Sequence, residues 1–236
     1  MVKRLKSWNK GLTKESNPSV LKISETFKRK KLDNFKEWRD RMKKIGKIPS
    51  KYPPFSKDGD LAELIGVVLG DGHIESFPRT ESLTIASNGS NKGFIRRYSD
   101  LVGKLFKKKP YQGRHSGGSN CVRIRIYQKN ISKRLGIPCG NKGGLKINTP
   151  GWIIKNKEYL KRYLRGLYEA EGSFCVHRPT YTYKFLFSNR NKYLKQNVYR
   201  ALKILGFHPH EGKYQIQISR KEEVYKAKES IRFRQY

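Results

Sequence analysis

The sequence has few of the features that would cross-link the chain through disulfides or a metal, or place it in a membrane. Only three of its 236 residues are cysteines: Cys121, Cys139 and Cys175. An odd count without a C-x-x-C pair predicts neither a disulfide framework nor a structural zinc site. No apolar run is long enough to span a bilayer, and residues 1–10 are basic and polar, so we expect no secretory signal. These absences predict an intracellular protein that is not secreted.

Acidic residues are also scarce. The chain has 19 Asp and Glu against 53 Lys and Arg, a formal net charge of +34. Such an excess costs self-repulsion and is typical of proteins that bind a polyanion. Nucleic acid is therefore the expected partner, and a membrane is not, because no basic helix has a broad apolar face. The chain also lacks a Ser/His/Asp arrangement, a glycine-rich phosphate-binding loop and a nucleotide fingerprint.

Two similar nine-residue segments organise the chain. Residues 64–72 read LIGVVLGDG and residues 164–172 read LRGLYEAEG. Small residues recur four positions apart on one face of each predicted helix: Gly66 and Gly70, then Gly166 and Ala170. Two helices with such faces can pack with their backbones close together. The first helix, expected over residues 61–70 with Asp60 as its N-cap, is apolar nearly all round and should be buried.

Each segment ends in an acid followed by a glycine. We expect Gly72 and Gly172 to end the two helices in a left-handed conformation. If the helices pack side by side, Asp71 and Glu171 lie together at negative helix ends, where two carboxylates repel each other. A divalent cation would relieve this repulsion, and carboxylates suit Mg²⁺. The pair predicts a metal site that can also bind a phosphate group. The alternative is that both acids are ordinary helix ends without a function.

The paired segments resemble the signature motifs of the LAGLIDADG homing endonucleases, in the form that carries both motifs in one chain. The resemblance covers residues from about Asp60 to the C-terminus. It implies a DNA endonuclease that hydrolyses one phosphodiester per strand across the minor groove, using Mg²⁺, for which Mn²⁺ or Ca²⁺ can substitute. Asp71 and Glu171 would be its catalytic, metal-binding acids, and the backbone carbonyls of Gly70 and Ala170 would be further metal ligands.

Two further positions follow from the same resemblance. An earlier acidic position of the motif is Leu69 in the first copy, a departure, and Glu169 in the second. Residues 140–144, GNKGG, resemble the family's glycine-lysine segment, which makes Lys142 the candidate catalytic lysine. Its alternative role is an ordinary phosphate contact. No such segment follows the second half, so a second lysine is not assigned.

An internal repeat extends beyond the motifs. Residues 84–88, TIASN, resemble 185–189, FLFSN, and residues 122–126, VRIRI, resemble 214–218, YQIQI. We therefore expect an α+β fold with two pseudo-symmetric α-β-β-α-β-β-α halves, over residues 58–150 and 151–236. Each half would carry a four-stranded antiparallel sheet, the sheets forming a DNA-binding saddle around the central motif helices.

Strand alternation predicts which side chains face DNA. Val122, Ile124 and Ile126 should point inward, and the residues between them outward, because successive side chains alternate between faces. Outward Arg and Gln can read guanine and adenine edges in the major groove, and the alternative is a solvated sheet face. The candidate DNA contacts of the two halves are Arg123, Arg125, Tyr127, Gln215, Gln217, Lys184, Arg178, His73 and Arg114.

Residues 1–57 form a basic extension that ends in a linker. Residues 8–24 resemble the nuclease-associated modular DNA-binding motif, with a helix expected to begin at Asn17 and Pro18. A second helix is expected over residues 33–44. The basic run of this extension supplies its candidate DNA contacts: Lys28, Arg29, Lys30 and Lys31.

The function predicted from these features is a site-specific DNA endonuclease of mobile-intron or intein type. It would act as a monomer on duplex DNA with a long target site, in the cytoplasm, the nucleoid or an organelle. Two alternatives stay open: a maturase that binds intron RNA on the same fold, and a catalytically silent DNA-binding regulator.

Overall fold

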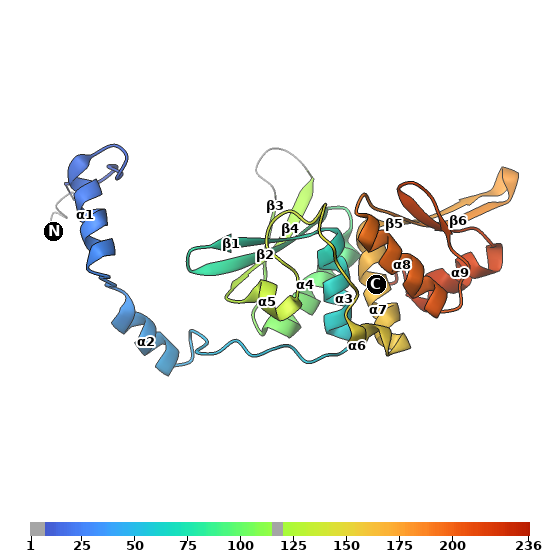
Figure 1. Ribbon diagram of the computed structural model, residues 1–236, viewed down its shortest axis with the longest axis horizontal. Helices are drawn as coiled ribbons and strands as arrows, with labels where there is room; N and C mark the ends of the chain where they lie inside the picture. The colour runs from blue at the N-terminus through green and yellow to red at the C-terminus, as the bar shows by residue number, and fades with distance from the viewer. Residues whose placement is uncertain (1–7, 115–119) are drawn as a thin grey trace. The chain divides into compact units, whose positions relative to one another are not determined.

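The computed structural model describes residues 8–114 and 120–236 (Figure 1). The chain divides into two compact units, Met1–Tyr52 and Pro53–Tyr236. Residues 1–7 of the predicted extension lie outside the described residues. Among the helices of the described ranges, none is both long and apolar enough to cross a bilayer.

The N-terminal unit contains two helices. Helix α1 (Pro18–Arg29) begins as predicted, because the Asn17 side chain accepts hydrogen bonds from the backbone N–H groups of Ser19 and Val20. Helix α2 (Lys36–Lys44) begins three residues later than predicted. The Asp33 side chain accepts a hydrogen bond from the backbone of Phe35 and so forms a turn before this helix. The side chains of the basic run 28–31 are exposed.

The larger unit is built from two halves with the same topology. The first half contains α3 (Gly59–Gly70), β1 (Gly72–Phe77), β2 (Thr80–Asn88), α4 (Lys92–Phe106), β3 (Tyr111–Arg114), β4 (Cys121–Gln128) and α5 (Ile131–Leu135). The second half contains α6 (Gly151–Ile154), α7 (Lys157–Glu171), β5 (Gly172–His177), β6 (Thr182–Ser188), α8 (Lys192–Ile204), β7 (His210–Glu211), β8 (Gln215–Ile218) and α9 (Lys221–Ser230). Both sheets are antiparallel, with the orders β1-β2-β4-β3 and β5-β6-β8-β7, so the predicted α+β fold and its repeat are confirmed.

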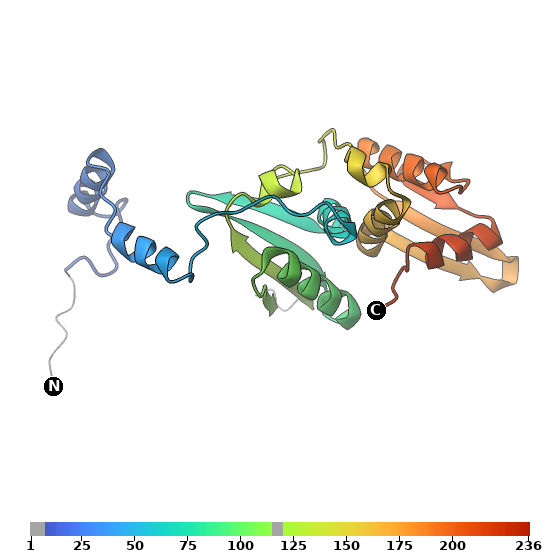
Figure 2. The same cartoon turned by 90° about the horizontal axis from the view of Figure 1, so that it is seen from below.

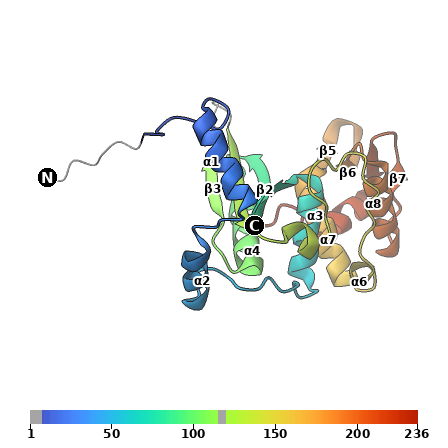
Figure 3. The ribbon, with the colours of Figure 1, turned by 60° about the vertical axis from the view of Figure 1, so that its left-hand side comes forward.

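The motif helices α3 and α7 lie side by side between the two sheets (Figures 1 and 3). Helices α4, α8 and α9 pack on the sheets of their own halves and leave the other sheet faces open (Figure 2). The side chains that point toward the helices are buried, including Ile124 and Ile126 on β4 and Ile216 and Ile218 on β8. The predicted alternation of these strands is therefore correct.

Two boundaries differ from the prediction. Helix α3 begins at Gly59 with Asp58 as its N-cap, not Asp60, since the Asp58 carboxylate accepts from the backbone N–H of Leu61 at 2.8 Å. Asp60 is free of the capping role and forms ion pairs instead. Residues 173–178 and 181–187 are predicted strands of the second half, but Arg178 lies outside the first of them, in a 3-10 turn (Arg178–Thr180) between β5 and β6.

Candidate active site

The two motif helices cross where their small residues meet. A Cβ atom added to Gly66 would lie 2.2 Å from the carbonyl oxygen of Tyr163, and one added to Gly166 would lie 2.2 Å from that of Glu63. A Cβ on Gly70 would lie 2.4 Å from the Cβ of Ala170. The backbones touch along this line, which leaves no room for side chains. The small residues therefore bring the C-terminal ends of α3 and α7 together.

The glycines that follow the two acids have a different role from the predicted one. Gly172 has φ −94° and ψ 154°, an extended conformation, and Gly72 is the first residue of β1. A Cβ on Gly72 would lie 2.5 Å from the Cα of Val68, and one on Gly172 would lie 2.4 Å from the carbonyl oxygen of Tyr168. The left-handed caps were thus a wrong prediction. Glycine is required there because each strand folds back directly against the helix it follows.

Asp71 and Glu171 extend from these adjoining helix ends. Desolvation by the surrounding protein, together with the charge of Glu171, raises the pKa of Asp71 to about 7, although the residue as a whole is exposed. Burial also raises the pKa of Glu171, and the amide of Asn189, which donates to its Oε1 at 2.9 Å, opposes that shift. Both carboxylates are therefore short of compensating positive charge.

The positive charge of Lys142 acts on both carboxylates. Its Nζ donates to the last carbonyls of α3, those of Val68, Leu69 (3.1 Å) and Gly70 (3.4 Å). A cation is favourable there because these carbonyls form the negative end of the helix. Desolvation lowers the pKa of Lys142 to about 8, against the opposing effect of Asp71 and Glu171. The structure thus brings together the three candidate catalytic residues.

The donor set fits a divalent cation only in part. In residues 8–114 and 120–236, no group of three or more His, Cys, Asp or Glu side chains is placed to hold a metal. Two carboxylates, backbone carbonyls, water and substrate phosphate are nevertheless the oxygen ligands that Mg²⁺ takes. The Gly70 carbonyl, a predicted ligand, already accepts from Lys142, and the Ala170 carbonyl lies at the matching helix end.

Sequence reasoning missed the residues that hold these groups in place. Asn191, the N-cap of α8, donates to the backbone carbonyls of Lys142 and Leu145, both at 2.9 Å, and so fixes the lysine loop of the other half. Asn189 and Arg190 line a cleft of about 800 Å³ beside Glu171. The Ser-Asn pair that recurs at 87–88 and 188–189 was the sequence feature that could have pointed to Asn189. It was misleading in the first half, where Asn88 bonds to Ser90 and Asn120 instead.

Most of the DNA contacts predicted in the two halves lie on the open faces of the sheets. Two do not: Arg114 pairs with Val122 on the helix-facing side of the first sheet, and Arg178 lies in the turn after β5. Strand register places His73, Thr84 and Arg125 in one row across the first sheet, and Arg125 donates to Thr84 at 3.0 Å. Arg123 lies one row away on β4 and Tyr127 is 43% exposed. In the second sheet Gln217 shares a row with His210. The remaining candidates Gln215, Lys184, Arg114 and Arg178 are partly or fully exposed.

The raised pKa of Asp71 predicts a pH-dependent stability without metal. Between its ordinary pKa near 4 and its folded value of about 7, the folded state keeps a proton that the unfolded state has lost. Stability should therefore fall as pH rises through this window, and Asp71→Asn should remove that part of the fall. Urea unfolding in EDTA at pH 5 and 7.5 measures it, with Asp100→Asn, an exposed acid on α4, as control. If the free energies of unfolding of wild type and Asp71→Asn differed by the same amount at both pH values, the prediction would be wrong.

Comparison with solved structures identifies similar folds. I-WcaI bound to its DNA recognition sequence is 17% identical, with a TM-score of 0.57 over 85% of this chain and 88% of that one. The N-terminal LAGLIDADG domain of DUF199/WhiA is 15% identical, with a TM-score of 0.52 over 79% and 87%. A variant of I-DmoI in complex with its target DNA in the presence of Mg is 18% identical, with a TM-score of 0.50 over 73% and 95%.

Comparison with curated proteins gives partial matches. The tRNA-splicing ligase RtcB of Methanopyrus kandleri is 29% identical over 132 residues, 50% of this chain but 13% of that protein. The replication factor C small subunit of Methanocaldococcus jannaschii is 29% identical over 130 residues, 50% of this chain and 7% of that protein. The chain therefore corresponds to a small part of each relative. No family model matches the sequence.

Proposed function

We propose that this chain, which has the fold of the LAGLIDADG homing endonucleases, is a divalent-metal-dependent, site-specific endonuclease of duplex DNA. The observation that carries the proposal is the placement of Asp71 and Glu171 at adjoining helix ends beside Lys142. Two carboxylates there do not stabilise the fold, because each lies at the negative end of a helix and each makes it harder for the other to ionise. A cation that also binds phosphate gives the arrangement a purpose.

The residues of the site have distinct roles in this proposal. Asp71 and Glu171 would hold Mg²⁺ with the carbonyls of Gly70 and Ala170, and the bound ion would supply an activated water and charge stabilisation at phosphate. Lys142 would pair with the negative charge that develops on the scissile phosphate. Its pKa near 8 leaves it mostly protonated at neutral pH yet able to exchange a proton with water.

The second cleavage position has its own polar groups. Asn189 fixes one oxygen of Glu171 by its 2.9 Å hydrogen bond, so the other oxygen stays available to a cation. Arg190 lines the same cleft and supplies a charge for phosphate where no second lysine was predicted. The two halves thus use different cations: a lysine from the loop between the halves and an arginine before α8.

The open sheet faces would bind the target. Arg123, Arg125, Gln215 and Gln217 carry the donors that read base edges in the major groove. Lys184, His73 and Tyr127 lie on the same sheet faces, Arg178 and Arg114 lie at strand ends, and all five would contact the backbone or the bases. With a net charge of +34, most of the affinity would come from phosphate contacts and would fall steeply with salt.

The curated relatives support a mobile origin. Their names describe an RNA ligase, a replication factor and an aminotransferase, and each matches this chain over a small part of its length. One shared segment does not perform three unrelated reactions. Partial matches to proteins of unrelated function are typical of a mobile insertion, which agrees with an endonuclease of intein or intron type.

Cleavage of an uninterrupted insertion site tests the proposal. A linear duplex should carry the sequences that flank the gene's reading frame, joined as they would be without it. We expect Mg²⁺-dependent double-strand cutting at the junction and none in the interrupted duplex. Tight binding of the intron transcript without DNA cutting would indicate a maturase, and binding of the junction without cutting in Mg²⁺ or Mn²⁺ would indicate a DNA-binding regulator.

The basic extension should add to DNA binding. Deleting residues 1–50 should weaken binding by roughly 10-fold or more and shorten the footprint, because it removes exposed Lys and Arg that can neutralise phosphates. Replacing Lys28, Arg29, Lys30 and Lys31 by Gln should make the plot of log affinity against log salt concentration less steep. The change should correspond to the loss of up to about 4 phosphate contacts. An unchanged footprint and salt slope would show that the extension does not contact DNA.

A further inference from the structure

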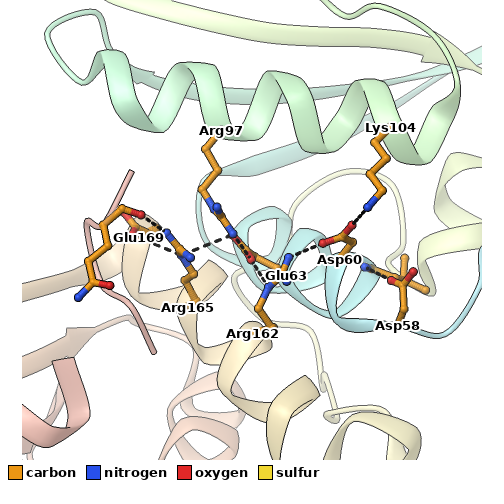
Figure 4. Close-up of polar contacts among 10 residues, drawn as sticks. Asp58, Asp60, Glu63, Arg97, Lys104, Arg162, Arg165 and Glu169 are labelled. Atoms are coloured by element: carbon orange, nitrogen blue, oxygen red, sulfur yellow. Dashed lines mark hydrogen bonds and ion pairs between the residues drawn. The ribbon is translucent and has the colours of Figure 1, made fainter. Parts of the chain in front are cut away.

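Buried charges join the two halves near the N-terminal ends of the motif helices (Figure 4). Glu63 of α3 is fully buried. Arg97 of α4, in the same half, donates to both of its carboxylate oxygens, at 2.5 and 2.7 Å. From α7, in the other half, the Nε of Arg162 donates to Oε2, and the Nε of Arg165 lies 3.7 Å from Oε1. One carboxylate of the first half therefore binds two guanidinium groups of the second.

Asp60 extends this cluster toward the surface. It accepts from Arg162 across the interface and from Lys104 of its own half at 2.5 Å. The ion pairs that cross the interface in this cluster join Asp60 and Glu63 of α3 to Arg162 and Arg165 of α7. Glu169, an acid on α7, is satisfied within its own half by the backbone N–H of Arg234 and the hydroxyl of Tyr236.

The packing surfaces, in contrast, are nearly the same on both helices. Gly66 packs against α7 as Gly166 packs against α3. In both cases an added Cβ would lie 2.2 Å from a backbone carbonyl oxygen of the other helix. Shape alone would therefore let α3 pack on a second copy of α3. Aligning the two motifs places Glu63 opposite Tyr163 in the repeat, and Arg162 and Arg165 opposite Ala62 and Ile65. The charges, not the shape, distinguish the two helices.

Like pairing would leave these charges without their partners. In an α3–α3 pair, Glu63 would keep only Arg97 and would face Ala62 and Ile65 of the copy. In an α7–α7 pair, Arg165, which is 3% exposed, would face a tyrosine in place of Glu63, although it would keep Glu169 of its own helix, 4.0 Å away, and the Gln235 carbonyl. The Nε of Arg165 has no hydrogen bond even in the native pairing, so it depends on the nearby carboxylates for compensation. Breaking a buried ion pair by removing one partner is strongly destabilising.

We propose that this cluster is a charge key: it makes the face of α3 a docking surface for α7 of this chain, in the same molecule or in a second copy, and excludes pairing between like halves. Charges at interface positions set partner choice in the same way in other helix pairs, where the mismatch is the discriminating element. The key lies on the motif helices but not at their catalytic ends, and it is independent of nuclease activity.

Two full-length variants test the key. Arg162→Glu places a carboxylate opposite both Glu63 and Asp60. The double variant Glu63→Arg/Arg97→Glu exchanges the charges within the first half and leaves a mismatch only toward α7. Each protein alone should melt roughly 10 °C lower than wild type. Refolded together, they should form a dimer in which the unchanged first half of one chain pairs with the unchanged second half of the other. Light scattering should show twice the mass, with most of the melting temperature recovered.

Lys161→Glu is the matched control. It makes the same charge change at the adjacent position of α7, where the lysine pairs with Glu158 of its own helix. Mixed with the first-half double variant, it should give no dimer beyond that of wild-type chain. Unchanged melting of the single proteins, or a mixture that stays monomeric and unrecovered, would overturn the proposal. If the single proteins do not fold alone, the combined variant Glu63→Arg/Arg97→Glu/Arg162→Glu decides: no recovery in that chain would also overturn it.

Discussion

Asp71→Asn should abolish double-strand cleavage and leave DNA binding largely intact. Asparagine matches aspartate in size but cannot supply the negative charge that a divalent cation needs, so the loss should be at least about 10²–10³-fold, as for other groups that stabilise charge in a transition state. The same reasoning applies to Glu171→Gln, in which the amide would keep an oxygen to accept from Asn189.

The measurement separates cutting from binding. Cleavage of the junction duplex in Mg²⁺ should disappear, while binding in Ca²⁺ should stay within about threefold of wild type, since neither acid lies among the outward sheet residues. Asp100→Asn on α4, an exposed acid outside the pair, should cut normally. Retained cleavage in Asp71→Asn would show that this acid is not needed for catalysis. Loss of folding or of DNA binding would show that it has a structural role.

Gly66→Ala should strongly destabilise the fold, as should Gly166→Ala, whose added Cβ would lie 2.2 Å from the carbonyl oxygen of Glu63. The Cβ added at Gly66 would lie 2.2 Å from the backbone oxygen of Tyr163 and 3.1 Å from the backbone nitrogen of Leu167, so α3 and α7 must move apart. Backbone atoms cannot turn aside as a side chain can. We expect a loss of about 3 kcal/mol in the free energy of unfolding, or roughly 10 °C in melting temperature.

Gly151→Ala provides the control for this substitution. Gly151 is the first residue of α6, and an added Cβ would meet nothing within 4 Å. Its free energy of unfolding in urea should change by less than about 0.5 kcal/mol. Equal melting temperatures for Gly66→Ala and wild type would show that the helices do not cross as closely as described. Separated helices would also separate Asp71 from Glu171, so we expect cleavage to fall in parallel.

Much of the fold was predictable because its signals are local. The period of small residues in 64–72 and 164–172 gave the contact face of the motif helices, and alternation in 122–127 gave the buried face of β4. The residue patterns predict a helix over 92–106 and a strand over 111–114, which match the bounds of α4 and β3, and the Asn17 cap begins α1 as predicted. Helix period, strand alternation and capping are all determined by neighbouring residues.

The errors arose where a residue responds to a distant segment. Gly72 and Gly172 were predicted as left-handed caps from their position alone, but the returning strands require glycine for space. Asp60 was predicted as the N-cap of α3, yet its carboxylate pairs with Arg162 of the other half. Glu63 was not singled out, because nothing in an apolar helix pattern indicates which distant arginines will meet one buried acid.

The sequence by itself determined two motif helices with small faces, an acid at the end of each, the strand residues that point outward and the basic character of the whole chain. These follow from the geometry of successive residues and from composition. Only the tertiary structure decided that Lys142, 74 positions from Val68, reaches the end of α3, that Asn191 holds its loop, and that Glu63 meets Arg162 and Arg165. Such contacts depend on how the two halves pack together, and that packing brings together residues that no local pattern relates.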